Sequence, residues 1–338
     1  MQNKIKKIRT AIIGAGKMGQ IHAKVYHQYP NCSLVGIVDS DAGKAKKLAR
    51  KFHCQSSRDY KELLGKTDAV TIATPTETHL QISRFFIENQ IPVLIEKPLS
   101  STVEEAEKVV GLAKKHNTLV AVGHSERCNP VVRAIKRLNI KPKFIQADRI
   151  SPYPFRSTDI GVVLDVMIHD IDIVLSLAES RIKNIEAVGV NVIADTEDIC
   201  NARIFFENGC IANITASRIA LKTERKVRVF SPQAYLSVDY FKKTGTVIKA
   251  DSNINVIEKL RELKKAGRFD LLKANWKDLL HIEKLDVDDK EPLRVEQEAF
   301  LNAVADAKTN PEVGAEEGLA AMQCAQKILD SLDEHKWD

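Results

Sequence analysis

The first 123 residues alternate short apolar runs with amphipathic segments. The apolar runs have the length of buried strands and cover Ile8–Ile13, Leu34–Asp39, Asp68–Thr74, Val93–Glu96 and Leu119–Gly123. Helical spacing of apolar residues predicts helices between them, over Lys17–Gln28, Ala42–Phe52, His79–Asn89 and Val103–Lys115. Because strands that alternate with helices of this length pair in parallel through right-handed crossovers, this region predicts a doubly wound parallel sheet.

Beyond Gly123 the pattern changes to extended segments with few helices. A helix, a strand and a helix come first, over Pro130–Leu138, Lys143–Ile150 and Gly161–Leu177. Strands follow over Ile185–Ala194, Asp198–Glu207, Cys210–Ile219, Lys226–Ser231, Ala234–Tyr240 and Gly245–Ala250. Lysine-rich surface helices are expected within Val256–Ile282, and closing helices over Leu293–Ala307 and Ala315–Leu332. We therefore predict an α/β protein with domains over residues 1–123 and 124–338, the second built on a large, mostly antiparallel open sheet.

Composition narrows the classes of protein that fit. The net charge of +6 is small for 338 residues, and no zinc-finger or RNA-recognition signature is present, so nucleic acid is not an expected partner. No apolar run reaches the roughly 18 residues that span a bilayer, and the N-terminus lacks a signal-peptide core. The six cysteines have no metal-site spacing. We expect a cytoplasmic protein with free thiols, no metal and no membrane segment.

A glycine motif joins the first predicted strand to the first helix. Gly14-Ala-Gly16-Lys-Met-Gly19 matches G-x-G-x-x-G, and Asp39 follows Gly19 by twenty positions at the end of the second strand. In that context the motif is typical of Rossmann dinucleotide-binding domains. Its first glycine permits the tight turn, the second lets the backbone approach a pyrophosphate, and the third allows close packing of helix on strand.

Asp39 bears on the choice of cofactor. Its carboxylate can accept hydrogen bonds from ribose hydroxyls, and it would repel a 2′-phosphate, so the sequence favours NAD over NADP. Lys44, Lys46 and Lys47 on the next helix leave NADP open, because one of them can reach a phosphate.

Lys97 follows the strand Val93–Glu96 and precedes Pro98. Ligands of doubly wound sheets bind beyond the carboxyl ends of the strands, so a lysine here is expected near the nicotinamide. The proline restricts the backbone of Lys97, and the bond between them is a candidate for the cis form. A surface lysine without a role is the alternative.

These motifs together resemble the glucose–fructose oxidoreductase/inositol dehydrogenase (Gfo/Idh/MocA) family. The resemblance includes Ala73-Thr-Pro-Thr-Glu-Thr-His79, Glu96-Lys97-Pro98 and Asp165-x-x-x-His169-Asp170-x-Asp172, and resumes near Glu291 and Gly314. It implies a dehydrogenase acting on CH–OH groups, with a C-terminal sheet through which the chain forms a dimer or tetramer. The cofactor-binding residues it implies are Gly14, Gly16, Lys17, Met18, Gly19, Asp39, Ser40, Thr74, Pro75, His79, Glu96 and Lys97.

The predicted helix Gly161–Leu177 carries a histidine and three carboxylates in an apolar segment, where unpaired charge is costly. On an α-helix Asp165, His169 and Asp172 share one face, and Asp170 points elsewhere. From the residues alone, the alternative to chemistry is that Asp165 and His169 pair with each other and with arginines at a domain boundary. The resemblance implies that Lys97, Asp165 and His169 are catalytic: His169 accepts the hydroxyl proton, Lys97 donates a hydrogen bond to the same oxygen, and Asp165 places the substrate or His169.

Two segments also resemble a subgroup of nucleotide-sugar dehydrogenases within the family, namely Gly123–Pro130 and Asp159–Asp172. This resemblance implies oxidation of the 3-hydroxyl of UDP-N-acetylglucosamine to the 3-keto sugar. The substrate-binding residues it implies are Lys97, Arg127, Asn129, Arg156, Asp165 and His169; Cys128 departs from the aromatic residue of the subgroup. Another nucleotide sugar, a free sugar or inositol is the alternative substrate. A dinucleotide-sensing regulator without catalysis is the alternative from another class.

Overall fold

The computed structural model describes residues 7–153, 160–250 and 281–334, together with 258, 261–262 and 264–265. The chain divides into two compact units. The N-terminal unit comprises Met1–Cys128 and Lys290–Gln326, and the C-terminal unit comprises Asn129–Asp289 and Lys327–Asp338. The predicted division into residues 1–123 and 124–338 differs from this, because the chain returns to the first unit near its end.

The N-terminal unit contains a six-stranded parallel sheet in the order β3-β2-β1-β4-β5-β6. Its strands are β1 (Ile8–Ile13), β2 (Cys32–Val38), β3 (Gln55–Ser57), β4 (Ala69–Ile72), β5 (Val93–Glu96) and β6 (Val120–Gly123). The order reverses between β1 and β4, which is where Rossmann folds bind their ligands. The predicted parallel sheet is confirmed. β3 was missed because Gln-Ser-Ser offers no apolar run.

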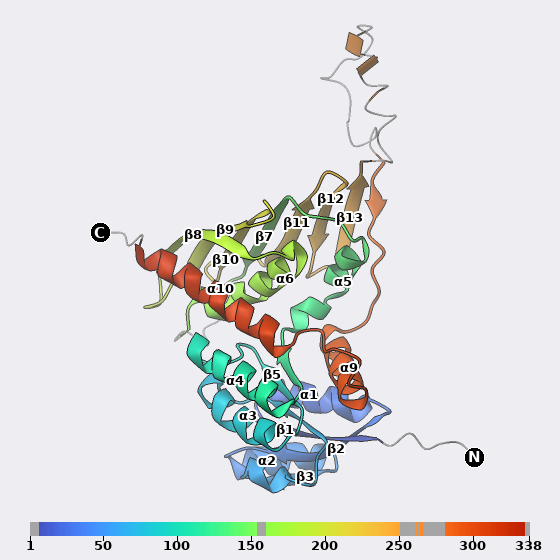
Figure 1. Ribbon diagram of the computed structural model, residues 1–338, viewed down its shortest axis with the longest axis vertical. Coiled ribbons are helices and arrows are strands. Elements are labelled where there is room, and N and C mark those ends of the chain that lie inside the picture. The colour runs from blue at the N-terminus through green and yellow to red at the C-terminus, as the bar shows by residue number, and fades with distance from the viewer. Residues whose placement is uncertain are drawn as a thin grey trace, which may run out of the picture. The chain divides into compact units, whose positions relative to one another are not determined.

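Helices cover this sheet (Figure 1). They are α1 (Lys17–Gln28), α2 (Ala42–Lys51), α3 (His79–Glu88) and α4 (Val103–His116), each within one residue of its predicted ends. α4 shows why the boundaries could be read from sequence. The hydroxyl of Thr102 caps its N-terminus by accepting the Glu105 N–H, and Asn117 ends it in the left-handed conformation.

The last part of the N-terminal core comes from α9 (Pro292–Ala305), which lies far along the chain. Phe300 of α9 is fully buried against Leu94 and Ala121 of the sheet. Leu301 belongs to the cluster of Ile12 and its neighbours on β1, β2, α1 and α2. These contacts explain why residues 290–326 fold with the first unit. α10 (Ala315–Glu334) follows.

The C-terminal unit is built on an eight-stranded sheet in the order β14-β13-β12-β11-β7-β10-β9-β8. Only β7 and β10 are parallel among these neighbours; the other pairs are antiparallel, which confirms the predicted mostly antiparallel sheet. The strands are β7 (Phe144–Ile150), β8 (Ile182–Val190), β9 (Ile199–Phe206), β10 (Ile211–Ser217), β11 (Glu224–Phe230), β12 (Ala234–Asp239), β13 (Thr244–Lys249) and β14 (Glu283–Lys284). The helices predicted within Val256–Ile282 lie almost entirely outside the described residues.

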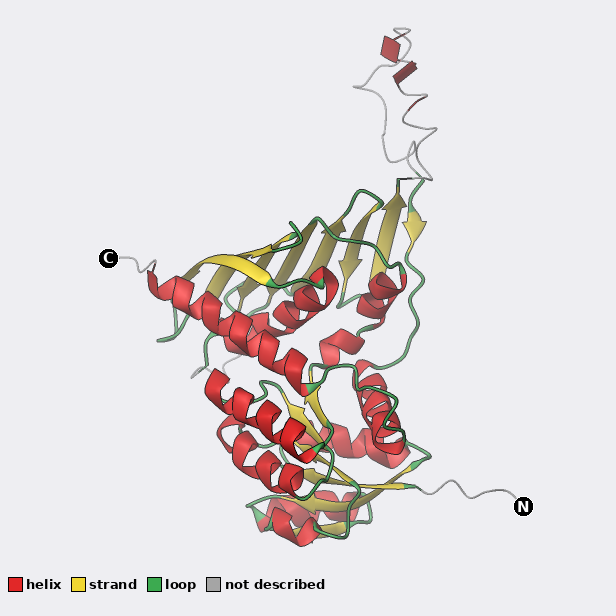
Figure 2. Cartoon of the chain, in the orientation of Figure 1, coloured by secondary structure: helices red, strands yellow, loops and turns green. Residues whose placement is uncertain are grey.

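The two faces of this sheet differ. α5 (Pro130–Arg137) and α6 (Ile168–Ala178) pack on one face, red helices against yellow strands in Figure 2. The other face carries a row of rings across three strands: the centroids of Phe144 and Phe230 are 5.6 Å apart, and those of Phe230 and Tyr235 are 4.9 Å apart. Phe230 is 37% exposed. This aromatic row leaves apolar surface on the side of the sheet away from the helices.

Candidate cofactor and active site

The glycine turn after β1 has the conformation that the dinucleotide motif requires. Gly14 has a φ of +101°, and a Cβ on it would lie 2.3 Å from the carbonyl oxygen of Ala73. A Cβ on Gly19 would lie 1.8 Å from the carbonyl oxygen of Gly14. At Gly16 a Cβ would meet nothing within 4 Å, and no side chain caps α1 there. Gly14 and Gly19 thus allow close packing, and Gly16 leaves the helix N-terminus open to an anion.

Asp39 is fixed beside this turn. Its Oδ2 accepts the N–H of Ala15 at 2.7 Å, and its Oδ1 accepts the N–H of Asp41 at 2.9 Å. The N–H of Gly14 donates to the carbonyl oxygen of Val38 at 2.7 Å, which ties the turn to the end of β2. Because each carboxylate oxygen has a second lone pair, Asp39 can still accept ribose hydroxyls.

A cavity of about 730 Å³ lies beside the turn, large enough for a cofactor. The predicted residues that line it are Gly14, Gly16, Lys17, Met18, Asp39, Ser40, Thr74 and Pro75. Sequence reasoning missed Arg58, Tyr60, Thr78 and Gln81, which line it too. Arg58 and Tyr60 follow β3 and Gln81 belongs to α3, where no motif marks them, whereas Thr78 lies within the Ala73–His79 segment but was not among the predicted site residues. This site fits a dinucleotide for two reasons. A side chain on Gly14 or Gly19 would clash with the turn, and the Asp39 carboxylate lies where the motif expects the ribose.

His79 does not line the cavity but lies behind it. Its buried ring has Nε2 3.0 Å from the carbonyl oxygen of Thr74 and Nδ1 3.0 Å from that of Pro98. Burial lowers the pKa of the imidazole, although these hydrogen bonds oppose the shift. The ring therefore links Thr74 in the cavity wall to Pro98, which follows Lys97, and so joins two parts of the candidate site.

Lys97 stands half-buried at the carboxyl end of β5. The Lys97–Pro98 peptide bond is cis, as the sequence suggested. Glu96 is only 9% exposed, and its Oε2 accepts the N–H of Lys97 at 3.3 Å. Glu96 and Lys97 are not among the residues that line the cavity beside Gly14. The lysine therefore has the strand-end position that the sequence predicted, and the side chain of Glu96 faces the protein interior.

The predicted helix Gly161–Leu177 is not one regular α-helix. A π-helix covers Val163–Met167, with the N–H of Ile168 donating to the carbonyl oxygen of Val163, and α6 begins at Ile168. The prediction that Asp165, His169 and Asp172 share a face assumed an unbroken α-helix, and that assumption is wrong between residues 163 and 167. π segments inside helices occur frequently at functional sites.

The carboxylates of this segment have different surroundings. Asp165 and His169 are half-buried, whereas Asp170 and Asp172 are each 1% exposed. Arg149 on β7 binds Asp170 through two hydrogen bonds, from Nε to Oδ2 at 2.6 Å and from a terminal nitrogen to Oδ1 at 3.0 Å. The sequence offered arginine pairing as an alternative for Asp165 and His169, whereas the arginine shown here pairs with Asp170. Asp165 and His169 are the pair with access to solvent.

The start of the segment is anchored by Glu197. The carbonyl oxygen of Glu197 accepts the N–H of Val162, and its Oε1 accepts the N–H of Val163, both at 3.0 Å. A Cβ on Gly161 would lie 2.1 Å from the Glu197 carboxylate, so only glycine leaves room for this contact. The backbone that carries Asp165 is therefore fixed by the loop between β8 and β9.

The predicted substrate residues near Pro130 are largely buried. Arg127 is 5% exposed within the N-terminal unit. Asn129 is 4% exposed, and its Oδ1 caps α5 by accepting the N–H of Val131 at 3.2 Å. Arg156 lies outside the described residues. Cys128 is fully buried.

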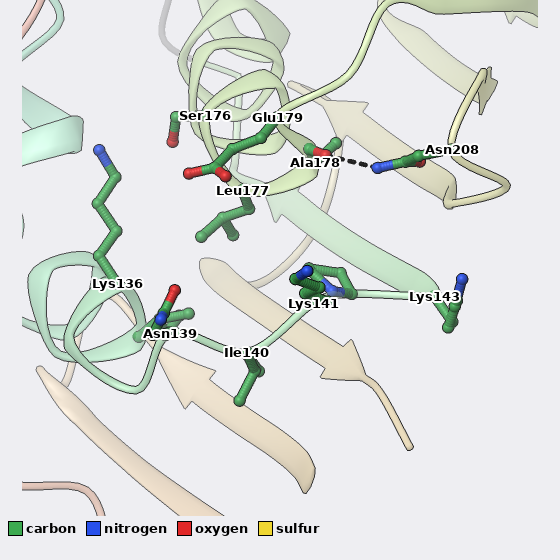
Figure 3. A pocket seen from close by; sticks show the side chains of 12 residues that line it. Lys136, Asn139, Ile140, Lys141, Lys143, Ser176, Leu177, Ala178, Glu179 and Asn208 are labelled. Carbon is green, nitrogen blue, oxygen red and sulfur yellow. Dashed lines mark hydrogen bonds between the residues drawn. The ribbon is translucent and has the colours of Figure 1, made fainter. Parts of the chain in front are cut away.

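A second cavity, of about 450 Å³, lies at the C-terminal ends of α5 and α6 (Figure 3). Lys136, Lys141 and Lys143 line it together with Glu179, and Asn208 donates to the carbonyl oxygen of Ala178 at 2.9 Å. It contains none of the predicted site residues. Within the described ranges, no group of His, Cys, Asp and Glu is arranged to hold a metal ion, and no helix is long and apolar enough to cross a membrane.

Two family models match this chain. "Oxidoreductase family, NAD-binding Rossmann fold" matches residues 8–124, which contain the glycine turn, Asp39 and Lys97. "GFO/IDH/MocA C-terminal domain" matches residues 144–237, which contain Asp165 and His169.

Curated relatives and solved structures agree with these models. UDP-N-acetylglucosamine 3-dehydrogenase of Acidithiobacillus ferrooxidans is 31% identical over 300 residues, covering 88% of this chain and 89% of that enzyme. A solved structure of that enzyme superposes with a TM-score of 0.85 at 28% identity, covering 97% of this chain and 98% of the other. scyllo-Inositol 2-dehydrogenase (NAD(+)) of Bacillus subtilis is 29% identical over 231 residues, covering 63% of this chain and 68% of the relative.

Proposed function

The chain belongs to the GFO/IDH/MocA oxidoreductase family, and on that premise we propose that it oxidises the 3-hydroxyl of UDP-N-acetylglucosamine to the 3-keto sugar. The observation that carries this choice is the 31% identity over 88% of the chain to an enzyme of that name. As a member of this family, the chain is an NAD-binding oxidoreductase that acts on CH–OH groups.

Cofactor binding uses the turn after β1 and the end of β2. The open N-terminus of α1 at Gly16 holds the pyrophosphate with backbone N–H groups, and Asp39 accepts hydrogen bonds from the ribose. Bound NAD supplies the carbon that accepts a hydride. Because Asp39 would repel a 2′-phosphate, NAD is preferred over NADP, although Lys44 and Arg58 line the same cavity.

Three side chains act on the sugar in this proposal. His169 takes the proton of the reacting hydroxyl as general base. The carbon that bears this hydroxyl loses its hydride to the bound NAD. Lys97 donates a hydrogen bond to the oxygen and stabilises the negative charge that develops there. Asp165 is half-buried in the π-helix that directly precedes α6, the helix of His169. It orients the imidazole of His169 or a neighbouring hydroxyl of the sugar. The mechanism requires Lys97 and His169 to reach one hydroxyl group.

Recognition of the nucleotide sugar falls to Arg127, Asn129 and Arg156 in this proposal. A guanidinium can bind a diphosphate through paired hydrogen bonds. Asn129 caps α5 with its amide oxygen, which leaves its amide N–H groups as donors.

The substrate is tested by initial rates of NADH formation with a panel of alcohols: UDP-N-acetylglucosamine, UDP-glucose, free N-acetylglucosamine and myo-inositol. We expect kcat/KM for UDP-N-acetylglucosamine to exceed the others by roughly 100-fold, because UDP-glucose lacks the acetamido group, free N-acetylglucosamine lacks the diphosphate, and myo-inositol lacks both. Borodeuteride reduction of the product should place deuterium at C3. Turnover of inositol or free sugar alone would favour the alternative substrates. NAD binding without turnover of any would favour a regulator.

A homo-oligomer formed through the C-terminal sheet is part of the proposal. The aromatic row Phe144, Phe230 and Tyr235 supplies apolar surface for a partner copy on the face that the helices leave open. Light scattering should give a dimer or tetramer for the wild type and a lower mass for Phe230→Asp. A monomeric wild type would contradict this part.

A further inference from the structure

A buried chain of hydrogen bonds runs from α9 through α1 to the end of β5. Nε2 of Gln297 lies 2.7 Å from Nδ1 of His22, and Nε2 of His22 lies 2.6 Å from Oε1 of Glu96. His22 and Gln297 are 0% and 1% exposed. Neither lines the cofactor cavity, and neither belongs to a motif that the proposed mechanism uses.

The geometry indicates the direction of the hydrogen bonds along this chain. Nε2 of Gln297 also lies 3.4 Å from the backbone carbonyl oxygen of His22. Because a carbonyl oxygen only accepts, the atom that faces it must be the amide nitrogen, which therefore donates to Nδ1. The ring proton is then on Nε2 and is donated to Glu96.

Glu96 consequently keeps a negative charge in the interior. Burial alone would raise the pKa of its carboxyl, but the hydrogen bond and the electrostatic interaction with His22, the N–H of Lys97 and the charge of Lys97 lower the pKa overall. Gly123 faces Glu96 across the sheet, and a Cβ there would lie 3.2 Å from Oε2. The carboxylate thus occupies space that a glycine leaves, and its position is closely defined.

We propose that His22 and Gln297 are positioning residues for Lys97: they hold the Glu96 carboxylate where it fixes the Lys97 backbone and provides a counter-charge for the ammonium group. This inference rests on the role of Lys97 in the proposed function. The connection is direct at its last step, since Oε2 of Glu96 accepts the N–H of Lys97 at 3.3 Å.

The alternative is that the chain only joins α9, α1 and β5 for stability. Tyr26 provides a matched comparison, because it lies one turn after His22 on α1 and is equally buried. Its hydroxyl shares a hydrogen bond of 2.7 Å with Thr71 on β4 and not with Glu96. Removing this hydroxyl weakens a buried connection between α1 and the sheet, while the Tyr26 ring, 6.4 Å from that of His22, and the hydrogen bonds of Gln297, His22 and Glu96 are retained.

The test compares His22→Leu, Gln297→Leu, His22→Gln and Tyr26→Phe in the full-length enzyme. The readouts are thermal stability, NADH affinity by fluorescence, kcat and KM with UDP-N-acetylglucosamine, and the rate of amine acetylation at Lys97 relative to Lys44 by mass spectrometry. We expect His22→Leu and Gln297→Leu to lower kcat by roughly 10-fold to 100-fold, with NADH affinity within about 3-fold of wild type. Acetylation of Lys97 should become several-fold faster, because the Glu96 carboxylate is no longer held in place as its counter-charge.

His22→Gln should recover most of kcat, because its amide can still donate to Glu96. Tyr26→Phe should lose stability while kcat and the acetylation rate stay within about 2-fold. An unchanged acetylation rate in His22→Leu and Gln297→Leu would overturn the inference, as would equal losses of kcat in His22→Leu and Tyr26→Phe. If His22→Leu and Gln297→Leu show faster acetylation of Lys97 but full turnover, and Lys97→Ala also shows full turnover, the positioning of Lys97 would stand. The proposed catalytic role of Lys97 would then be refuted.

Discussion

Asp198 and Arg218 form an ion pair that is closed to solvent. Nε of Arg218 lies 2.7 Å from Oδ1 of Asp198, and their side chains are 1% and 0% exposed. The other carboxylate oxygen accepts the N–H groups of residues 192–194, and Arg218 donates to the carbonyl oxygen of Ile160. The pair therefore holds the loop before β9 and the chain just before Gly161, next to the Glu197 contact that anchors the helix of His169.

Asp198→Asn should destabilise the protein by about 3–5 kcal/mol, because it leaves the Arg218 guanidinium buried without its counter-charge. The free energy of unfolding, measured by urea denaturation at neutral pH, checks this. Glu88→Gln is the control: it breaks the exposed Arg84–Glu88 pair and should cost less than about 1 kcal/mol. Equal losses in the two variants would contradict the structural role of the buried pair.

The contribution of Asp198 should also depend on pH. Burial alone would raise the pKa of this carboxyl, but the backbone N–H groups and Arg218 lower it to about 2 from an ordinary value of 3.8. A lowered pKa in the folded state means that the stabilisation is complete above about pH 4 and is lost as the pH falls toward about 2. Urea denaturation at decreasing pH should show the difference between wild type and Asp198→Asn shrinking in that window, and a widening difference would contradict the sign.

Gly14→Ala and Gly16→Ala should have opposite effects on folding and binding. Gly14 needs its left-handed φ and has no room for a Cβ, so alanine there should lower the melting temperature by several degrees or prevent folding. Gly16 has open space, so its variant should fold normally and lose NAD affinity by roughly 10-fold, because the methyl group occupies the pyrophosphate position. Thermal unfolding and NADH fluorescence titration measure both, and normal NADH affinity in Gly16→Ala would place the pyrophosphate elsewhere.

Asp39→Ser should shift cofactor preference. Losing hydrogen bonds to a charged acceptor should weaken NAD binding by roughly 10-fold to 100-fold. NADP binding should improve, since the carboxylate no longer repels the 2′-phosphate and Lys44 and Arg58 remain in the cavity. Dissociation constants for both cofactors decide this, with Asp41→Asn as a control that alters an exposed helix cap nearby. Unchanged preference in Asp39→Ser would remove Asp39 from the ribose site.

The sequence was sufficient to predict the ends of helices and strands that have strong local signals. The first strand and helix, Ile8–Ile13 and Lys17–Gln28, have their predicted ends because a glycine turn separates them. β3 escaped because its three residues are polar, and the return of α9 to the first core rests on packing by Phe300 that no local pattern encodes.

Site residues that belong to a motif with fixed spacing could be predicted from the sequence. Site residues whose position depends on tertiary contacts could not. The glycine turn and Asp39 lie where the motif requires. The π segment at Val163–Met167 was missed, because it depends on Glu197, which approaches from another loop. Arg58 reaches the cavity from a loop without a motif, and the partners of His22 are distant in sequence.

The most direct test of the account is steady-state turnover of UDP-N-acetylglucosamine by Lys97→Ala and His169→Ala, with NADH affinity measured on the same samples and exposed Lys108→Ala as control. We expect kcat to fall by roughly 100-fold or more in both site variants, with NADH affinity within about 3-fold of wild type. Near-normal kcat in both Lys97→Ala and His169→Ala would contradict it.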